Sequence, residues 1–125
     1  MEVKKDCFYT KEHEWIKIEG NVGVVGITSY AQDTLGDITF VEFLAEGKEI
    51  SQFERIGTVE SVKAASDIYS PLSGKIVSIN TTTVESPEII NTSPYEEGWL
   101  VKIEIKDAES EIKNLMKPQD YEEYL

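Results

Sequence analysis

The sequence predicts a mostly-β fold, a small barrel or a sandwich, on three observations. Short runs rich in Val, Ile, Thr and aromatic residues recur along the middle of the chain. Turn signals separate these runs, such as Glu19-Gly20-Asn21 and Pro71-Leu72-Ser73-Gly74. The length of 125 residues, of which 40% are hydrophobic, suits one hydrophobic core. Many short strands joined by glycine-containing turns are typical of small barrels and sandwiches.

The predicted strands are spread over residues 14–105. No Pro/Gly/Ser-rich linker or low-complexity tract divides the chain, so we predict a single domain over residues 1–125. The last strand alternates apolar and polar residues in its second half, as a half-buried strand does. The six strands are Trp15–Glu19, Val22–Ile27, Ile38–Phe43, Gly57–Val62, Gly74–Ile79 and Leu100–Ile105.

Short helices are expected between the strands. Thr28 is suited to cap a helix over Ser29–Leu35, and Gly36 is suited to the position just past its end. Pro87–Asn91 is compatible with one helical turn that has proline near its start.

A helical tail is predicted over residues 107–125. Asp107 can cap a helix over Ala108–Met116, whose Ile112, Leu115 and Met116 give an apolar face at helical spacing. Pro118 ends this helix and opens a last turn through Tyr121 and Tyr124.

The charge of the chain limits its partners. Twelve Lys and Arg against 24 Asp and Glu give a formal net charge of −12. This balance argues against nucleic-acid binding and against adhesion to an anionic membrane, and it favours partners with basic patches. No apolar stretch approaches the ~20 residues of a membrane span, and the N-terminus does not resemble a signal or transit peptide. The single Cys7, to which no role is assigned, allows no internal disulfide. We therefore expect a cytoplasmic protein, or a mitochondrial matrix protein if it is a processed eukaryotic one.

Signals for catalysis are poor. Neither a P-loop nor a Gly-x-Gly-x-x-Gly motif occurs. The only histidine, His13, lies between Glu12 and Glu14, and on a strand its side chain would point to the face opposite both carboxylates. Zinc sites use three or four ligands, usually several His or Cys, so no metal site is predicted. We predict no catalytic residue and no self-sufficient enzyme.

The most informative segment is the hairpin at residues 57–76, which is predicted as strand, tight turn and strand. Its tip, Lys63-Ala64-Ala65-Ser66, has small side chains around one long amine. A single exposed lysine is most often a solubilising surface residue. The sequence on both sides changes that interpretation.

Short motifs along nearly the whole chain accompany this hairpin. They are Tyr9-Thr10-Lys11-Glu12-His13-Glu14-Trp15, Val25-Gly26-Ile27-Thr28, Tyr30-Ala31-Gln32, Leu35-Gly36-Asp37, Phe40-Val41-Glu42, Glu60-Ser61-Val62-Lys63-Ala64, Pro87-Glu88-Ile89-Ile90-Asn91 and Pro94-Tyr95-Glu96-Glu97-Gly98-Trp99-Leu100. In order and spacing they resemble the H-protein family of the glycine cleavage system. The sequence differs from the usual family pattern at three places. Leu44 stands where proline is usual, Glu12 stands where other polar residues are common, and Thr81-Thr82-Thr83 replaces a more acidic turn.

The resemblance implies a flattened lipoyl-type barrel, a barrel-sandwich hybrid of two antiparallel sheets with short helices. It implies that Lys63 carries lipoic acid in amide linkage, as a swinging arm. The carrier would take the aminomethyl group of glycine from a pyridoxal-phosphate glycine decarboxylase to an aminomethyltransferase, in glycine catabolism and one-carbon metabolism. Dihydrolipoamide dehydrogenase would reoxidise the dithiol, and a lipoylating enzyme would load a monomeric carrier. Relatives also suggest that Glu14 and Asp67 line the cleft in which the loaded arm docks.

Other interpretations stay open on the sequence. The same hairpin would serve an H-like carrier that donates lipoate to other proteins or that works in sulfur oxidation. An unmodified interaction module is disfavoured by the intact hairpin, and an enzyme that uses His13 with a carboxylate comes last. Biotin carriers and the lipoyl domains of 2-oxoacid dehydrogenases match less well, because Val62 and Ala64 flank the lysine.

Overall fold

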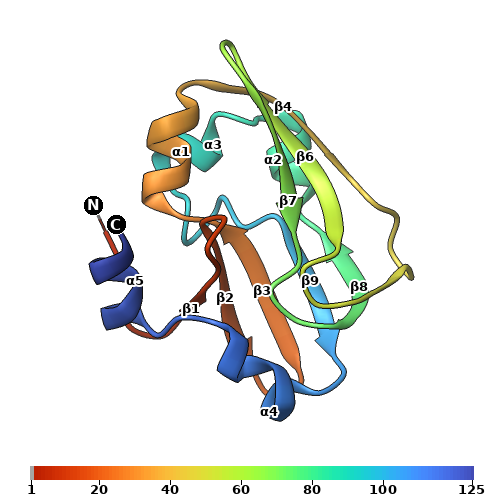
Figure 1. Cartoon of the computed structure of the whole chain (residues 1–125). Coiled ribbons are helices and arrows are strands. Elements are labelled where there is room, and N and C mark those ends of the chain that lie inside the picture. Colours follow the sequence, from red (N-terminus) through yellow and green to blue (C-terminus); the bar gives the residue numbers. More distant parts are fainter. Residues whose placement is uncertain (1) are drawn as a thin grey trace.

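Two antiparallel sheets and several short helices make up the computed structural model, which describes residues 2–125 (Figure 1). The larger sheet has six strands in the order β1-β2-β3-β9-β8-β5. These are β1 (Phe8–Tyr9), β2 (Glu14–Glu19), β3 (Val22–Ile27), β9 (Val101–Ile105), β8 (Gly74–Ile79) and β5 (Glu49–Ile50).

The smaller sheet consists of β4 (Ile38–Phe43), β6 (Arg55–Ser61) and β7 (Ala65–Tyr69), in the order β4-β6-β7. Strand β6 therefore lies in the middle, and β7 lies at one edge. In Figure 1 the turn between β6 and β7 extends beyond the rest of the molecule at the top. Thr58 pairs with Asp67 across these two strands, and Glu60 pairs with Ala65.

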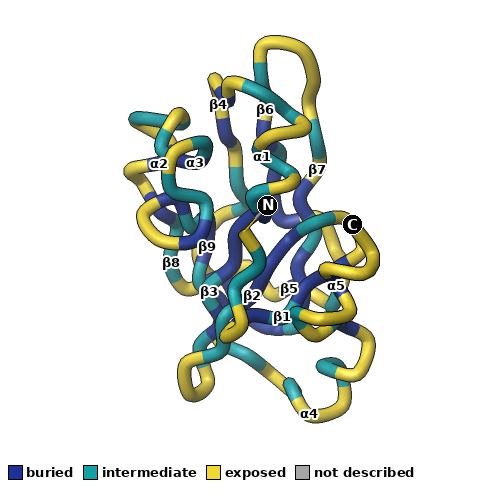
Figure 2. Tube along the Cα trace, turned by 90° about the vertical axis from the view of Figure 1, so that its left-hand side faces the viewer, coloured by how far each residue is buried: buried dark blue, intermediate teal, exposed yellow. Residues whose placement is uncertain are grey.

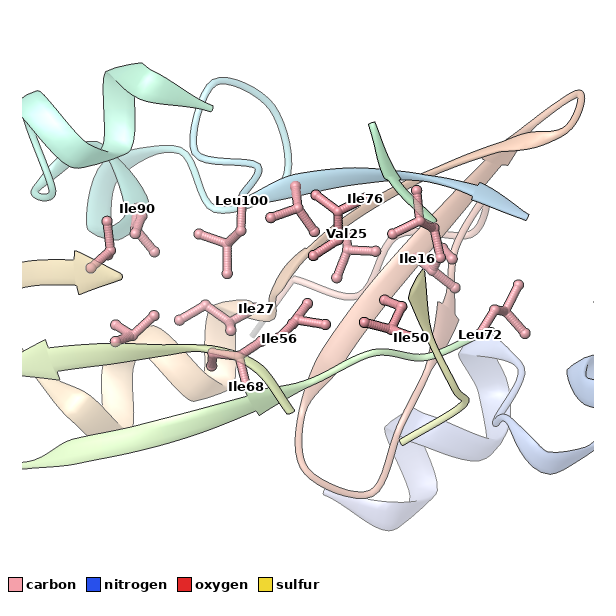
Figure 3. Close-up of a cluster of buried hydrophobic side chains, with 14 of the residues drawn as sticks. Ile16, Val25, Ile27, Ile50, Ile56, Ile68, Leu72, Ile76, Ile90 and Leu100 are labelled. Atoms are coloured by element: carbon pink, nitrogen blue, oxygen red, sulfur yellow. The ribbon is translucent and has the colours of Figure 1, made fainter. Parts of the chain in front are cut away.

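The hydrophobic core lies between the two sheets (Figure 3). Side chains from β2, β3, β8 and β9 point toward side chains from β6 and β7, since alternate residues of a strand face the same side. A second buried cluster joins the N-terminal segment, β2 and the last helix. The first cluster includes Ile16, Val25, Ile27, Ile56, Ile68, Leu72, Ile76 and Leu100, and the second includes Cys7, Tyr9, Trp15, Tyr95 and Tyr121.

The predicted helix α1 (Ser29–Leu35) is confirmed, including its cap. The side chain of Thr28 accepts a hydrogen bond from the backbone N–H of Ala31, and Gly36 follows the helix with a positive φ of 82°. The helical turn predicted over Pro87–Asn91 is observed slightly later, as α3 (Ile89–Thr92).

The helix predicted over Ala108–Met116 is wrong in its second half. Only α4 (Ala108–Glu111) and a 3-10 turn (Ile112–Asn114) form, with Asp107 as the cap of α4. Leu115 is extended, and Met116 exchanges two backbone hydrogen bonds with Tyr9, with N···O distances of 2.8 and 2.9 Å. This pairing with β1 stabilises an extended backbone that the local apolar spacing could not predict.

The C-terminal turn agrees with the prediction, whereas one helix in the middle of the chain was not predicted. The last helical turn is confirmed as α5 (Pro118–Tyr124), which places Tyr121 in the second buried cluster. An unpredicted helix, α2 (Thr81–Glu85), begins where Asn80 accepts a hydrogen bond from the N–H of Thr82. The mostly-β architecture of two antiparallel sheets is as predicted.

Candidate functional site

Lys63 lies in the exposed turn between β6 and β7 (Figure 2). The N–H of Ser61 donates to the carbonyl of Ala64 at 2.7 Å and closes the turn. The hydroxyl of Ser61 accepts from the N–H groups of Lys63 and Ala64, at 3.3 and 3.1 Å. The turn therefore has a defined backbone while its side chains face solvent; Val62 is 74% exposed.

A neighbouring loop supports this turn from the side. The N–H of Val62 donates to the carbonyl of Asp37 at 3.2 Å. Gly36 precedes this anchor, and a Cβ added there would lie 3.4 Å from Cε of Lys63 and 3.9 Å from Nζ. The Lys63 side chain thus lies against Gly36, which has no side chain.

A cavity of about 400 Å³ lies where the two sheets meet near the N-terminal turn. It combines polar, charged and aromatic side chains from four parts of the chain. Its lining residues are Thr10, Lys11, Glu12, Glu14, Phe53, Tyr69 and Asn114.

Glu14, the first residue of β2, is the buried carboxylate of this cavity. The hydroxyl of Thr10 donates to one of its oxygens, and the N–H of Tyr69 donates to the other at 3.0 Å. The ion pairs found among residues 2–125 do not include it. Burial raises the pKa of the Glu14 carboxyl to about 7, and the hydrogen bonds from Thr10 and Tyr69 oppose this rise. Hydrogen bonds from the chain itself thus occupy both oxygens of this fully buried carboxyl group.

Asp67, the other carboxylate predicted for the site, is exposed and does not line the cavity. One of its oxygens accepts from Nε of Arg55 at 3.1 Å and from the hydroxyl of Thr58 at 3.2 Å. Asp67 and Tyr69 share a face of β7, because side chains two residues apart on a strand point the same way. Asp67 therefore lies between the hairpin tip and the cavity, and its part in docking stays a prediction.

His13 lies among aromatic side chains in this molecule. Its Nδ1 lies 2.8 Å from the hydroxyl of Tyr121, and its ring contacts those of Tyr30 and Tyr124. Burial lowers the pKa of His13, and the charge of Glu12 opposes this. Within residues 2–125, no group of three or more His, Cys, Asp and Glu side chains could hold a metal ion.

Several cavity residues were not found from the sequence. Phe53, Tyr69 and Asn114 come from separate segments and carry no local signal that links them to Glu14. Thr10 is different, since it belongs to the same short motif as Glu14. The role of Gly36 beside Lys63 also depends on a contact between distant segments.

The comparisons with known proteins agree over nearly the whole chain. Residues 7–125 match the family model described as glycine cleavage H-protein. The chain is 52% identical over 123 residues to the glycine cleavage system H protein of Carboxydothermus hydrogenoformans, covering 98% of this chain and 94% of the relative. It is 51% identical over 122 residues to the protein of the same name from Symbiobacterium thermophilum, with the same coverage.

A solved structure supports the same relationship. The crystal structure of a glycine cleavage system H protein from Mycobacterium marinum superimposes with a TM-score of 0.84, at 38% identity and with 95% of each chain covered. The predicted lipoyl-type fold is thereby confirmed.

Proposed function

The chain belongs to the glycine cleavage H-protein family, the lipoyl carriers of the glycine cleavage system, and we propose that Lys63 is its attachment residue. The observation that carries this proposal is the position of Lys63 in a hydrogen-bonded, exposed turn at the tip of the β6–β7 hairpin. An enzyme that modifies a folded carrier needs such a side chain, because the amine must enter a second active site.

The surroundings of Lys63 fit an amide-linked lipoyl group. Ala64 and Ala65 are small, and Gly36 leaves space along the lysine stem. The bound group supplies a pair of sulfur atoms that accept the aminomethyl group of glycine and are later reoxidised. The chain itself contributes presentation and shelter, and we propose that it is a carrier and substrate of the system's enzymes, with no catalytic residue of its own.

We propose that the cavity beside β7 receives the loaded end of the arm. Glu14 would hold the positively charged amine of the cargo, since an opposite charge nearby favours the ionised forms of both groups. Phe53 and Tyr69 offer apolar surface to the uncharged part of the arm. Asp67 lies along the same strand face and is the second candidate for contact with the arm.

The proposed partners follow from the system to which the family belongs. They are the pyridoxal-phosphate glycine decarboxylase, the aminomethyltransferase, dihydrolipoamide dehydrogenase and a lipoylating enzyme. The charge of −12 supports transient encounters with basic faces on these enzymes. We further propose a monomeric, cytoplasmic carrier. Within residues 2–125, no helix is both long enough and apolar enough to cross a membrane.

The experiment that tests the attachment site is mass spectrometry of the protein from its native host. The intact mass should exceed that of the unmodified chain by one lipoyl group, and peptide mapping should place the increment on Lys63. Lys75, an exposed lysine on β8 in the same 57–76 segment, is the internal control and should stay unmodified. A lipoyl group on another lysine would contradict the proposal. Reconstitution of glycine cleavage with this chain as the only carrier then separates this function from a lipoate-relay role or a role in sulfur oxidation.

A further inference from the structure

One short turn supplies most of the cavity wall. Residues 10–14 connect β1 to β2 and include four of the cavity's lining residues: Thr10, Lys11, Glu12 and Glu14. The turn also contains the donor for Glu14, since Thr10 bonds to its carboxylate. A shift of this turn would therefore change both the shape of the cavity and the surroundings of the carboxylate.

The turn has hydrogen bonds of its own and one residue in an uncommon backbone conformation. The hydroxyl of Thr10 accepts from the N–H groups of Glu12 and Glu14, at 3.2 and 3.1 Å. His13 has a φ of 70°, in the left-handed region that non-glycine residues rarely adopt. Such a residue persists only where the surrounding structure fixes it. Within the turn and its neighbours, the N–H of Thr28 donates to the carbonyl of His13 at 3.0 Å. The side chain of His13 has its hydrogen-bond partner in a distant segment.

That partner is α5, the last helix of the chain, which packs against β1 (Figure 1). The hydroxyl of Tyr121 lies 2.8 Å from Nδ1 of His13 and 2.8 Å from the hydroxyl of Thr28. The ring of Tyr121 is stacked on Tyr9, with centroids 4.4 Å apart and planes within 4°. One turn later, the hydroxyl of Tyr124 donates to the carbonyl of Lys11 at 2.9 Å. Two tyrosines of one helix thus bond to two residues of the 10–14 turn.

We propose that α5 is a brace that holds the 10–14 turn in the arrangement in which Glu14 faces the cavity, with His13, Tyr121 and Tyr124 as positioning residues. The proposal rests on the proposed function only where it concerns the arm. The contacts are specific to the turn: Tyr121 bonds to His13 and Tyr124 bonds to Lys11, while the backbone of Met116 already ties the start of this segment to Tyr9. The two hydroxyls therefore add contacts to the 10–14 turn beyond this backbone pairing.

The test uses substitutions that remove one hydroxyl each and keep the ring. Tyr121→Phe removes the bonds to His13 and Thr28, and Tyr124→Phe removes the bond to Lys11. Tyr95→Phe is the matched control, because the Tyr95 hydroxyl also bonds to backbone groups of other segments, at Glu2 and Ser29, but not to the 10–14 turn. Tyr124 is 48% exposed, so its substitution is not expected to unfold the protein.

The first measurement is the titration of the Glu14 carboxyl by carbon-13 NMR in the unlipoylated chain. The charged and polar groups around this carboxyl are Thr10, Lys11, Glu12, Asn114 and the N–H of Tyr69. If the brace holds the turn, Tyr121→Phe and Tyr124→Phe should move the midpoint from about 7 toward the ordinary value of 4.5, because a relaxed turn admits water to the carboxyl. Tyr95→Phe should leave it unchanged.

Equal midpoints in all four proteins would overturn the brace, and so would a shift with Tyr95→Phe as large as with the other two. His13→Gly gives an independent check, because glycine tolerates the positive φ but lacks the imidazole. It should shift the Glu14 midpoint in the same direction, and the double variant with Tyr121→Phe should shift it no further than the larger single effect.

The second measurement concerns the arm and is made on the lipoylated proteins. The lifetime of the loaded carrier should shorten in Tyr121→Phe and Tyr124→Phe and stay unchanged in Tyr95→Phe. A shifted Glu14 midpoint with an unchanged lifetime would support the brace and contradict docking of the arm in this cavity. An unshifted midpoint would overturn the brace whatever the lifetime, so the two proposals fail separately.

Discussion

The carboxylate of Glu14 accepts a hydrogen bond from the backbone N–H of Tyr69, and this bond connects the two sheets at the cavity. Glu14 begins β2 in the larger sheet, and Tyr69 ends β7 in the smaller one. The other end of β7 adjoins the turn that carries Lys63. A single strand of five residues, about 13 Å long, therefore leads from the turn that carries Lys63 to the buried carboxylate.

Replacing Lys63 by arginine should abolish loading without affecting the fold. The side chain is exposed, so the free energy of unfolding should change by no more than about 0.5 kcal/mol. Lipoylation needs an amine that can lose a proton, and guanidinium remains protonated. Lys63→Arg should therefore gain no lipoyl mass in a lipoylating host and support no glycine cleavage, while Lys75→Arg should behave as the parent. Full activity of Lys63→Arg would exclude the arm.

The buried Glu14 should make the stability of the protein depend on pH. Its pKa is raised from 4.5 to about 7 in the folded state, so between these values the folded protein binds more protons than the unfolded chain. The free energy of unfolding should consequently fall as pH rises through this range. Glu14→Gln cannot ionise, so it should lack this pH-dependent loss of stability, which reaches about 3 kcal/mol at pH 8. Denaturant unfolding at pH 5 and pH 8 measures it. Parallel pH profiles for the parent and Glu14→Gln would contradict the prediction, and Glu109→Gln, at an exposed position on α4, is the control.

Removal of the same carboxylate should shorten the lifetime of the loaded carrier. Glu14→Ala takes away the negative charge that stabilises the cationic amine of the cargo, and the neutral amine is lost more readily. For a lost interaction of about 1.4 kcal/mol, breakdown should be about tenfold faster. The rate of ammonia release from isolated loaded protein measures this. Asp67→Asn, measured beside it, tests the second candidate, and an unchanged lifetime in Glu14→Ala would exclude Glu14 from the shelter.

Gly36 should matter for lipoylation as well as for stability. Its φ of 82° strains any other residue, and such a conformation costs roughly 1–3 kcal/mol. Gly36→Ala should also slow lipoylation, because its methyl group would contact the Lys63 side chain. Gly47→Ala is a matched control, since Gly47 has a φ of 91° but no heavy atom within 4 Å of an added Cβ. Comparable destabilisation with slower loading only in Gly36→Ala is the expected result, and equal loading rates would contradict it.

The acidic surface should speed encounters with the lipoylating enzyme at low salt. Charge attraction is screened beyond roughly 10 Å at 0.1 M ionic strength, so the loading rate should fall as salt increases. Glu60→Gln, on the hairpin, should reduce both the rate at low salt and its salt dependence. Glu109→Gln, an exposed residue on α4, is the distant control. A loading rate that is flat from low to moderate salt would contradict electrostatic attraction and leave the carrier function intact.

Local features of the fold were predictable where local chemistry decides them. Thr28 caps α1 and Gly36 follows it, as a short polar side chain and a residue without Cβ at these positions predict. The β6–β7 hairpin was predicted by its apolar strands and small tip. The segment after Asp107 was not, because the backbone of Met116 pairs with Tyr9, more than 100 residues earlier.

The residues of the candidate site likewise fall into those that the sequence predicts and those that only the packing of the two sheets brings together. Lys63 and Glu14 lie in short motifs that resemble those of the H-protein family, so this resemblance allowed both to be proposed before the structure was known. The cavity requires Phe53, Tyr69 and Asn114 to meet Glu14, and only the packing of the two sheets brings them together. The bond from Tyr121 to His13 likewise joins residues that no local pattern relates.

The position of β7 at the edge of its sheet has a consequence for self-association. An edge strand exposes backbone groups that can pair with a strand of another molecule. Here the N–H of Tyr69 is already bonded to Glu14, and the charge of Asp67 projects from the same strand. Both features oppose the addition of a foreign strand at this edge, and therefore oppose aggregation through it.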